Sequence, residues 1–250
     1  MHRSCQARAT DYALAGSTTP EKHHLRLRRA LCTTAGHYAK VRRSPCGKAS
    51  TERENRMSID FNAGKWLNEP ANWRADEAAL TLTTDEKTDF WRETHYGFIR
   101  DSGHFLAFPR ADGFTAQIRV QGEFRTLYDQ AGLMVRIDEK RWVKTGVEFT
   151  DGEAFLSTVV TDGKSDWSVA QPFKELEDFR IRVTVKNGAM RIQASRDGSF
   201  WPLLRLAPFP AAMHYEVGPT ACTPERSGLR VRFSEFSIGA AITTGLHDLS

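Results

Sequence analysis

Alternation of apolar and polar residues runs through much of the chain after residue 57 and predicts β-strands. The clearest example is residues 114–121, where Phe114, Ala116, Ile118 and Val120 alternate with polar residues. Successive residues of a strand point to opposite faces, so one face of this segment is apolar and the other polar. Comparable segments are expected at 79–83, 154–161, 179–185, 190–195, 200–206, 215–222 and 229–238.

The spacing of these segments predicts the fold class. Strands of five to nine residues recur with Gly, Asp and Asn turns, and Asn187-Gly188 is a strong hairpin signal. Helix candidates are limited to 69–79 and 174–178, and no fixed repeat suggests a propeller or solenoid. We therefore expect an all-β fold, a jelly-roll β-sandwich, in one domain covering residues 57–250.

Residues 129–149 predict a β-hairpin with two contrasting faces. Leu133, Val135 and Ile137, followed by Val143, Val147 and Phe149, form an aliphatic face. Arg136, Trp142, Lys144 and Glu148 fall on the opposite face. The aliphatic face is expected to fix the hairpin in the sandwich. The polar face is where we look for function.

Charge is distributed unevenly along the chain, whose formal net charge is +4. Residues 1–56 hold 12 of the 35 Lys and Arg residues and 4 of the 31 Asp and Glu residues, a net charge of +8. Residues 57–250 therefore carry a net charge of −4. The basic character belongs to the first segment, so we expect the domain to have no nucleic-acid partner.

Cysteine content and hydropathy bear on location. Cys222 is the only cysteine of residues 57–250, so an internal disulfide is excluded there and a cytoplasmic location is favoured. No apolar run reaches the roughly 18 residues of a membrane-spanning helix, and no membrane partner is expected.

Residues 1–56 lack strand alternation, a sustained helical stripe and the apolar core of a secretory signal. Their Arg-rich composition leaves an organellar transit peptide open, whereas their Cys and His residues lack zinc-ligand spacing. We prefer to interpret 1–56 as a basic, disordered or wrongly assigned extension, because patterning begins abruptly at Met57. Failure of a protein that begins at Met57 to fold would contradict this interpretation.

Several motifs together resemble a known family. They are Thr88-Asp-Phe-Trp91, Tyr96-Gly-Phe98, Asp129-Gln-Ala-Gly-Leu133, Trp142-Val-Lys-Thr-Gly-Val-Glu148 and Ser165-Asp-Trp-Ser168. In order and spacing they resemble domain-of-unknown-function family 1349, whose fungal relative has been linked to regulation of enolase. The resemblance covers essentially all of 57–250. It implies a concanavalin A-like lectin/glucanase sandwich, a fold that hosts lectins, glycosidases and structural modules alike.

Enzymatic activity is the less favoured hypothesis. Retaining glycosidases hold two carboxylates about 5 Å apart and inverting ones about 6.5–9.5 Å apart. The Glu-x-Asp-x-x-Glu pattern of glucanases with this fold is missing, and the nearest match, residues 148–153, departs from it. Glu148 is a weak catalytic candidate, for which a cross-strand ion pair with a basic neighbour is the simpler interpretation. No nucleophile, phosphate-loop or dinucleotide motif occurs, and neither a cofactor nor a metal is expected.

Binding of a carbohydrate or related polyhydroxy ligand, without catalysis, is the favoured hypothesis. Aromatic rings stack on the apolar face of a sugar while polar groups bond its hydroxyls. The candidate ligand-binding residues are Trp142, Lys144, Glu148, Arg136, Gln117, Trp91, Tyr96 and Trp167. A large aromatic side chain more often fills a core or plugs a loop. Trp142 is the exception, because alternation places it on the polar face of the hairpin, opposite to the face that carries Val143 and Val147. A protein-interaction module is a third hypothesis, which predicts a co-purifying partner or a homodimer.

Overall fold

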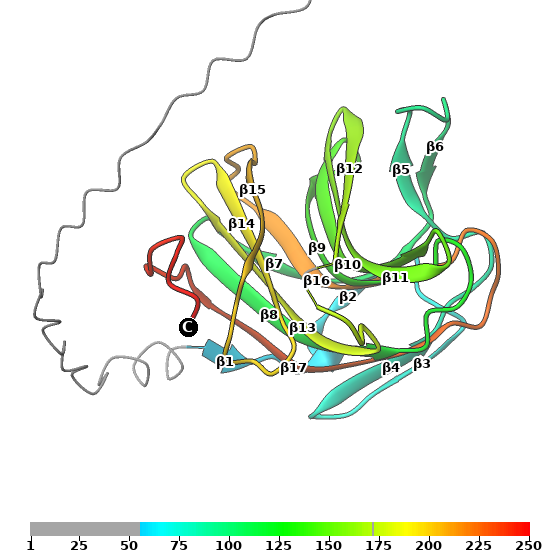
Figure 1. The fold of residues 1–250 in the computed structure, drawn as a ribbon, viewed down its shortest axis with the longest axis horizontal. Helices are drawn as coiled ribbons and strands as arrows, with labels where there is room; N and C mark the ends of the chain where they lie inside the picture. Colours follow the sequence, from blue (N-terminus) through cyan, green and yellow to red (C-terminus); the bar gives the residue numbers. More distant parts are fainter. Residues whose placement is uncertain (1–55, 172) are drawn as a thin grey trace, which may run out of the picture. The chain divides into compact units, whose positions relative to one another are not determined.

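Two antiparallel β-sheets face each other in the computed structural model, which describes residues 56–250 except residue 172 (Figure 1). In spatial order, the eight-stranded sheet contains β15 (Leu203–Pro208), β14 (Ala189–Ser195), β13 (Asp178–Lys186), β8 (Phe114–Gly122), β17 (Arg230–Ala240), β4 (Ala79–Thr83) and β3 (Asn72–Ala75), with β1 (Arg56–Ser58) paired to β17. The all-β sandwich prediction is confirmed. The prediction for residues 1–56 lies outside the described residues, except that Arg56 begins β1.

The seven-stranded sheet carries the predicted hairpin near its centre. Its order is β12 (Lys164–Ala170), β11 (Glu153–Asp162), β10 (Arg141–Thr150), β9 (Gln130–Asp138), β16 (Tyr215–Cys222), β7 (His104–Arg110) and β2 (Lys65–Leu67). The remaining elements are a 3₁₀ turn, η1 (Phe61–Ala63), and a separate two-stranded hairpin, β5 (Phe90–Arg92) and β6 (Ile99–Asp101). We call residues 90–101 the cap hairpin.

The helix expected at 69–79 is wrong. Asp76 Oδ1 accepts hydrogen bonds from the backbone N–H groups of Ala78 and Ala79, at 2.9 and 2.8 Å. This Asp turn folds β3 back on β4, so that Ala75 pairs with Leu80. Residues 174–178 also lack a helix, and Glu175 has a φ of 64°.

The main core fills the space between the two large sheets. The apolar residues of β8 and the aliphatic face of β9–β10 meet there, with side chains such as Ile118, Val120, Leu133, Val135 and Val143 fully buried. Burial of an aliphatic side chain of this size contributes roughly 1.5–3 kcal/mol. The aliphatic face therefore fixes the hairpin in the sandwich, as the alternation predicts.

A second, smaller core lies on the other face of the seven-stranded sheet, beneath the cap hairpin. It contains Phe90, Trp91, Phe105, Ala107, Met134, Trp142 and Val159. In Figure 1 this face forms the inside of a bend, with β12 on one side and the cap hairpin on the other. The polar face of β9–β10 is thus also covered, but by a different layer.

Candidate functional site

Trp142 belongs to the second core and is not exposed. Its side chain has 0% exposure, and its ring lies 6.0 Å from that of Phe90 in the cap hairpin. The expectation that Trp142 stands on an open polar face is therefore wrong. Alternation correctly assigned its side of the strand, but the cap hairpin covers that side.

Two ion pairs attach the base of the cap hairpin to the sheet. Lys144 Nζ lies 2.8 Å from Oδ1 of Asp89, the residue before β5. The Arg136 guanidinium makes a bidentate pair with Asp101, the last residue of β6, at 2.7 and 2.8 Å. Charge-assisted pairs of this geometry are among the stronger hydrogen bonds in proteins. Two of the expected ligand-binding cations thus hold the second layer in place.

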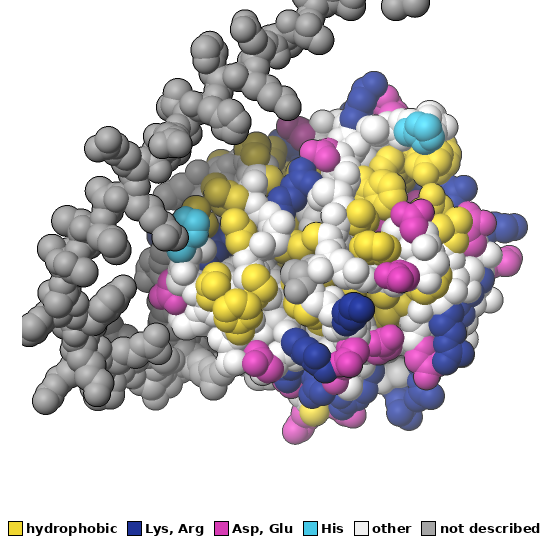
Figure 2. Space-filling view, viewed as in Figure 1, with side chains coloured by type: hydrophobic (Ala, Val, Ile, Leu, Met, Phe, Trp, Pro, Cys, Tyr) yellow, Lys and Arg dark blue, Asp and Glu magenta, His cyan; other side chains and the backbone are white. Residues whose placement is uncertain are grey.

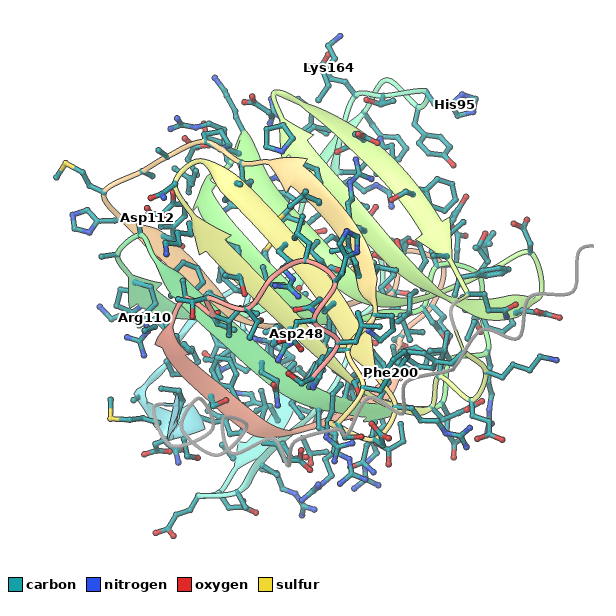
Figure 3. All side chains as sticks on the ribbon, turned by 60° about the vertical axis from the view of Figure 1, so that its left-hand side comes forward. His95, Arg110, Asp112, Lys164, Phe200 and Asp248 are labelled. Carbon is teal, nitrogen blue, oxygen red and sulfur yellow. The ribbon has the colours of Figure 1, made fainter. Side chains whose placement is uncertain are left out.

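The tip of the cap hairpin is held by the turn between β11 and β12. Arg92 donates from its backbone N to Ser165 Oγ and from its side chain to Gly163 O, at 2.9 and 3.0 Å. Lys164 pairs with Glu93 at 3.0 Å. Figure 3 shows Lys164, the first residue of β12, and His95, in the turn of the cap hairpin, at the same end of the molecule. The cap hairpin is therefore fixed at both ends.

Two facing glycines let β9 and β10 approach closely below this layer. Gly132 and Gly146 are directly paired. A Cβ on Gly132 would lie 2.0 Å from Thr145 O, and one on Gly146 would lie 2.1 Å from Ala131 O. No side chain fits in either place, which explains the glycines in the Asp-Gln-Ala-Gly and Trp-Val-Lys-Thr-Gly motifs. Lys144 and Glu148 flank this flat patch of backbone on β10.

A buried aspartate shapes the neighbouring turn. Asp129 is fully buried, accepts the backbone N–H groups of Arg125 and Thr126, and pairs with Arg226. The turn holds Tyr128 at a φ of 62°, in the left-handed region that bulky residues rarely adopt. Strained backbone of this kind clusters at functional sites. Here it presents the Tyr128 side chain to a cavity.

That cavity has a volume of about 130 Å³ and lies between the cap hairpin, the Tyr128 turn and β10–β12. We call it the aromatic pocket. Its aromatic lining consists of Trp91, Tyr96, Phe98, Tyr128 and Trp167. Its polar and charged lining consists of Asp89, Arg100, Gln130, Lys144, Glu148 and Glu225. A cavity of roughly 150 Å³ admits one benzene ring, so the pocket has room for one small ring.

The aromatic wall is internally ordered. The rings of Tyr96 and Phe98 stack at 5.3 Å, and the Tyr96 and Tyr128 hydroxyls are hydrogen-bonded at 3.0 Å. This hydrogen bond, with burial, raises the pKa of Tyr128 to about 12. The Trp91 indole donates to Thr94 O at 3.0 Å. Trp167 remains 38% exposed, so one large ring of the wall is accessible from outside.

Lys144 is a buried cation at the floor of the pocket. Burial is the largest single influence and lowers its pKa, but the neighbouring acidic groups Asp89, Cys222 and Glu148 together outweigh burial, and the net effect is an increase. Lys144 therefore stays protonated at physiological pH, and it does not serve as a general base.

Glu148 presents the second carboxylate of the floor. It accepts hydrogen bonds from Ser157 Oγ at 2.6 Å and from the Trp167 indole at 3.0 Å, both through Oε2. Burial raises the pKa of Glu148, although the Lys144 charge and the Ser157 hydrogen bond oppose this effect. No hydrogen bond to Oε1 is found in the described part of the chain, which leaves this oxygen available to a ligand.

Five of the predicted ligand-binding residues line the pocket: Trp91, Tyr96, Lys144, Glu148 and Trp167. The other three, Trp142, Arg136 and Gln117, do not. Gln117 lies on β8 of the other sheet, where it pairs with Arg182 and Ser237. The alternation within one strand cannot show to which of the two sheets that strand belongs.

The sequence prediction did not select Asp89, Phe98, Arg100, Tyr128, Gln130 or Glu225, which also line the pocket. A signal for three of them was present, because Asp89, Phe98 and Gln130 lie within the motifs that resemble the family. Tyr128 and Glu225 lie in turns outside those motifs.

Neighbouring groups with other chemistry have structural roles. His104 Nδ1 hydrogen-bonds Asn68 O at 2.7 Å, and its Nε2 accepts from the Asp85 backbone at 3.0 Å. Burial raises the pKa of the Cys222 thiol to about 12, so this sulfur is no activated nucleophile. Within residues 56–250, residue 172 excepted, no group of three or more His, Cys, Asp or Glu side chains is arranged to hold a metal ion. The same part of the chain has no helix long and apolar enough to cross a membrane.

Comparison with known proteins places this architecture in a family. Residues 66–241 match the family described as "Protein of unknown function (DUF1349)". "Regulation of enolase protein 1" of Saccharomyces cerevisiae is 58% identical over 193 residues, which cover 77% of this chain and 98% of that protein.

Two solved structures resemble this chain to different degrees. A functionally unknown protein from Saccharomyces cerevisiae is 57% identical, with a TM-score of 0.72 over 74% of this chain and 100% of that one. A Bacteroides ovatus protein described as "Xyloglucan PUL GH43B" shares only the fold, at 16% identity and a TM-score of 0.52 over 73% of this chain and 38% of that one. By its sequence match over most of its length, the chain belongs to the DUF1349 family.

Proposed function

We propose that the aromatic pocket binds a carbohydrate or related polyhydroxy ligand, one ring at a time, without catalysis. The carrying observation is the combination of the half-exposed Trp167 ring with Glu148, whose Oε2 fixes that ring. A sugar ring stacked on an indole places its equatorial hydroxyls at the ring's edge, within reach of neighbouring polar groups. Here those groups are Glu148, Asp89 and Lys144.

Preorganisation supports binding. Trp167 is held by Glu148 and Ser157, and Tyr128 by its turn and by the Tyr96 hydroxyl. A ligand that enters this pocket orders few new side chains, which reduces the entropic cost of association. The size of the cavity favours a single ring or the end of a longer chain over an internal segment of a polymer.

The direct test titrates the full chain with a panel of mono- and oligosaccharides while tryptophan fluorescence and thermal stability are recorded. We expect one class of sugar to quench fluorescence and raise Tm, and Trp167→Ala to abolish both effects. Trp73→Ala is the matched control, since Trp73 is 36% exposed, lies on β3 and does not line the pocket. A response that survives Trp167→Ala, or no response across the panel, contradicts the proposal.

Hydrolysis of a glycoside is the second candidate function. The observation in its favour is that Asp89 and Glu148, from distant segments, both line the pocket, and burial raises the pKa of Glu148. A raised pKa suits a general acid, and an ionised partner suits a base or nucleophile. Hydrolysis predicts release of reducing sugar that Glu148→Gln and Asp89→Asn each abolish. Sugar binding without release of reducing sugar would support the binding proposal and contradict hydrolysis.

The name of the Saccharomyces cerevisiae relative suggests a third role, regulation linked to enolase. This role is compatible with ligand binding, because a sugar-binding protein can report a metabolic state to a partner. Its support is the 58% identity alone. Co-purification of the full chain with a partner, in the presence and absence of the sugar found in the titration, distinguishes it from simple binding.

A further inference from the structure

A second concave site lies on the outer face of the eight-stranded sheet. It is a groove of about 530 Å³, which falls within the range of roughly 300–1,000 Å³ usual for small-molecule sites. Five arginines line it: Arg74, Arg125, Arg226, Arg230 and Arg232. We call it the arginine groove. None of its lining residues lines the aromatic pocket.

Strand register gathers three of these arginines around one hydroxyl. Thr81 of β4 pairs with Arg74 of β3 on one side and with Arg232 of β17 on the other. Neighbouring strands lie about 4.8 Å apart, so both arginines start close to Thr81. Arg230 is two residues from Arg232 on the same exposed face, about 7 Å along the strand. Arg74 and Arg232 therefore start directly beside Thr81 and Arg230 beside Thr83, and all three side chains line the groove.

These three arginines lack carboxylate partners, unlike the other two. Arg226 pairs with the buried Asp129 at 2.5 Å, and Arg125 pairs with Glu123. Arg232 donates to the Gln121 amide oxygen at 3.3 Å. For Arg74 and Arg230, no side-chain hydrogen bond or ion pair is found among residues 56–250, leaving out residue 172.

The surrounding acidic groups neutralise only part of this cluster. Two glutamates, Glu123 and Glu177, line the groove with the five arginines. Asp76 lies near Arg74 and Arg232 and offsets part of their charge, although its Oδ1 also accepts the turn's backbone N–H groups. Figure 2 shows Lys and Arg side chains, with Asp and Glu among them, along the lower edge of the molecule, where Figure 1 places β3 and β4.

We propose that the arginine groove binds a small phosphorylated ligand, whose phosphate groups are held by Arg74, Arg230 and Arg232. The planar guanidinium matches the geometry of phosphate oxygens and stays charged at every physiological pH. Thr81 supplies a hydroxyl donor at the centre. A compact, multiply charged group can contact all three guanidinium groups at once, whereas the carboxylates of an acidic peptide are spaced along its chain.

The test measures binding of inorganic pyrophosphate to the full chain by calorimetry and by thermal shift, at low and at physiological salt. We expect saturable binding at one site, weakened at least tenfold (about 1.4 kcal/mol) by Arg230→Gln and by Arg232→Gln. Arg110→Gln is the matched control, because Arg110 ends β7 of the other sheet (Figure 3). The basic residues 1–56 are present in every variant, so their attraction for anions is common to all.

The outcomes separate the proposal from its alternatives. Thermal melts without ligand first establish that each variant is folded. If Arg110→Gln weakens pyrophosphate binding as much as Arg232→Gln does, the attraction is diffuse and the proposal is overturned. It is also overturned if pyrophosphate shows no saturable binding while a hexaglutamate peptide binds, since the groove would then serve an acidic polypeptide.

Discussion

The two faces of the seven-stranded sheet are both buried, but by layers of different kinds. One face packs on the eight-stranded sheet through an aliphatic core that includes Leu133, Val135 and Val143. The other packs under the cap hairpin through aromatic residues, and ion pairs of Lys144 and Arg136 anchor that hairpin. A continuous apolar core leaves no room for polar chemistry. A small cap held by charges creates an aromatic cavity with carboxylates at its floor.

Replacement of Trp142 tests whether the second layer is a true core. Trp142→Ala removes a fully buried ring and leaves a cavity, so we expect the free energy of unfolding to fall by about 3–5 kcal/mol. Leu133→Ala, its counterpart in the main core, should cost about 2–5 kcal/mol. Urea unfolding of both variants measures the difference. A loss below about 1 kcal/mol for Trp142→Ala would show that the cap hairpin packs loosely, and the two faces would then differ more than the structure implies.

Removal of the charged anchor should have the next largest effect. Lys144→Met leaves the Asp89 carboxylate beneath the cap hairpin without its cation, which we expect to cost about 3 kcal/mol. The double variant Lys144→Met with Asp89→Asn should recover part of this loss, because no unpaired charge remains. Lys65→Met, at an exposed lysine of β2, is the control. Equal losses in the single and double variants would show that Lys144 contributes by packing rather than by charge.

Adding a side chain where β9 and β10 approach closely should lower the free energy of unfolding by somewhat less. The Cβ of Gly146→Ala would meet Ala131 O at 2.1 Å, so the two strands must separate, at a cost of about 2 kcal/mol. The control is Gly245→Ala, where an added Cβ meets no atom within 4 Å. The same variant should weaken sugar binding, since Lys144 and Glu148 flank Gly146. Stability within about 0.5 kcal/mol of wild type would show that the strands separate freely.

Local patterns predicted much of the sheet but little of the second layer. The period of two assigned Arg136, Trp142, Lys144 and Glu148 to one face of the hairpin, as the structure has them. It could not show that this face is covered, because the covering contacts join residues far apart in sequence. Lys144 meets Asp89 across 55 residues, and Arg136 meets Asp101 across 35. Whether a polar face is a surface or a second core depends on such contacts, which leave no periodic signal.

The smallest effect we predict concerns pH, and it distinguishes the pocket carboxylate from surface ones. Burial raises the pKa of Glu148 above its ordinary value of 4.5. The folded protein therefore binds this proton more tightly than the unfolded chain, so Glu148 adds stability as pH falls toward 4.5 and opposes folding once it is ionised. At pH 7, Glu148→Gln should be more stable than wild type by about 1.4 kcal/mol for each unit by which the pKa is raised. The advantage should vanish below pH 4.5.

Urea unfolding of wild type and Glu148→Gln between pH 4 and 8 measures this difference, with Glu216→Gln, at an exposed position of β16, as the control. A difference independent of pH would mean that Lys144 and the Ser157 hydrogen bond fully compensate for burial. The Glu148 carboxylate would then be ionised at neutral pH, as suits an acceptor of ligand hydroxyls. A difference that is still growing between pH 7 and 8 would show that Glu148 keeps its proton near neutral pH, as a general acid needs, and hydrolysis would become the stronger of the two functions proposed for the aromatic pocket.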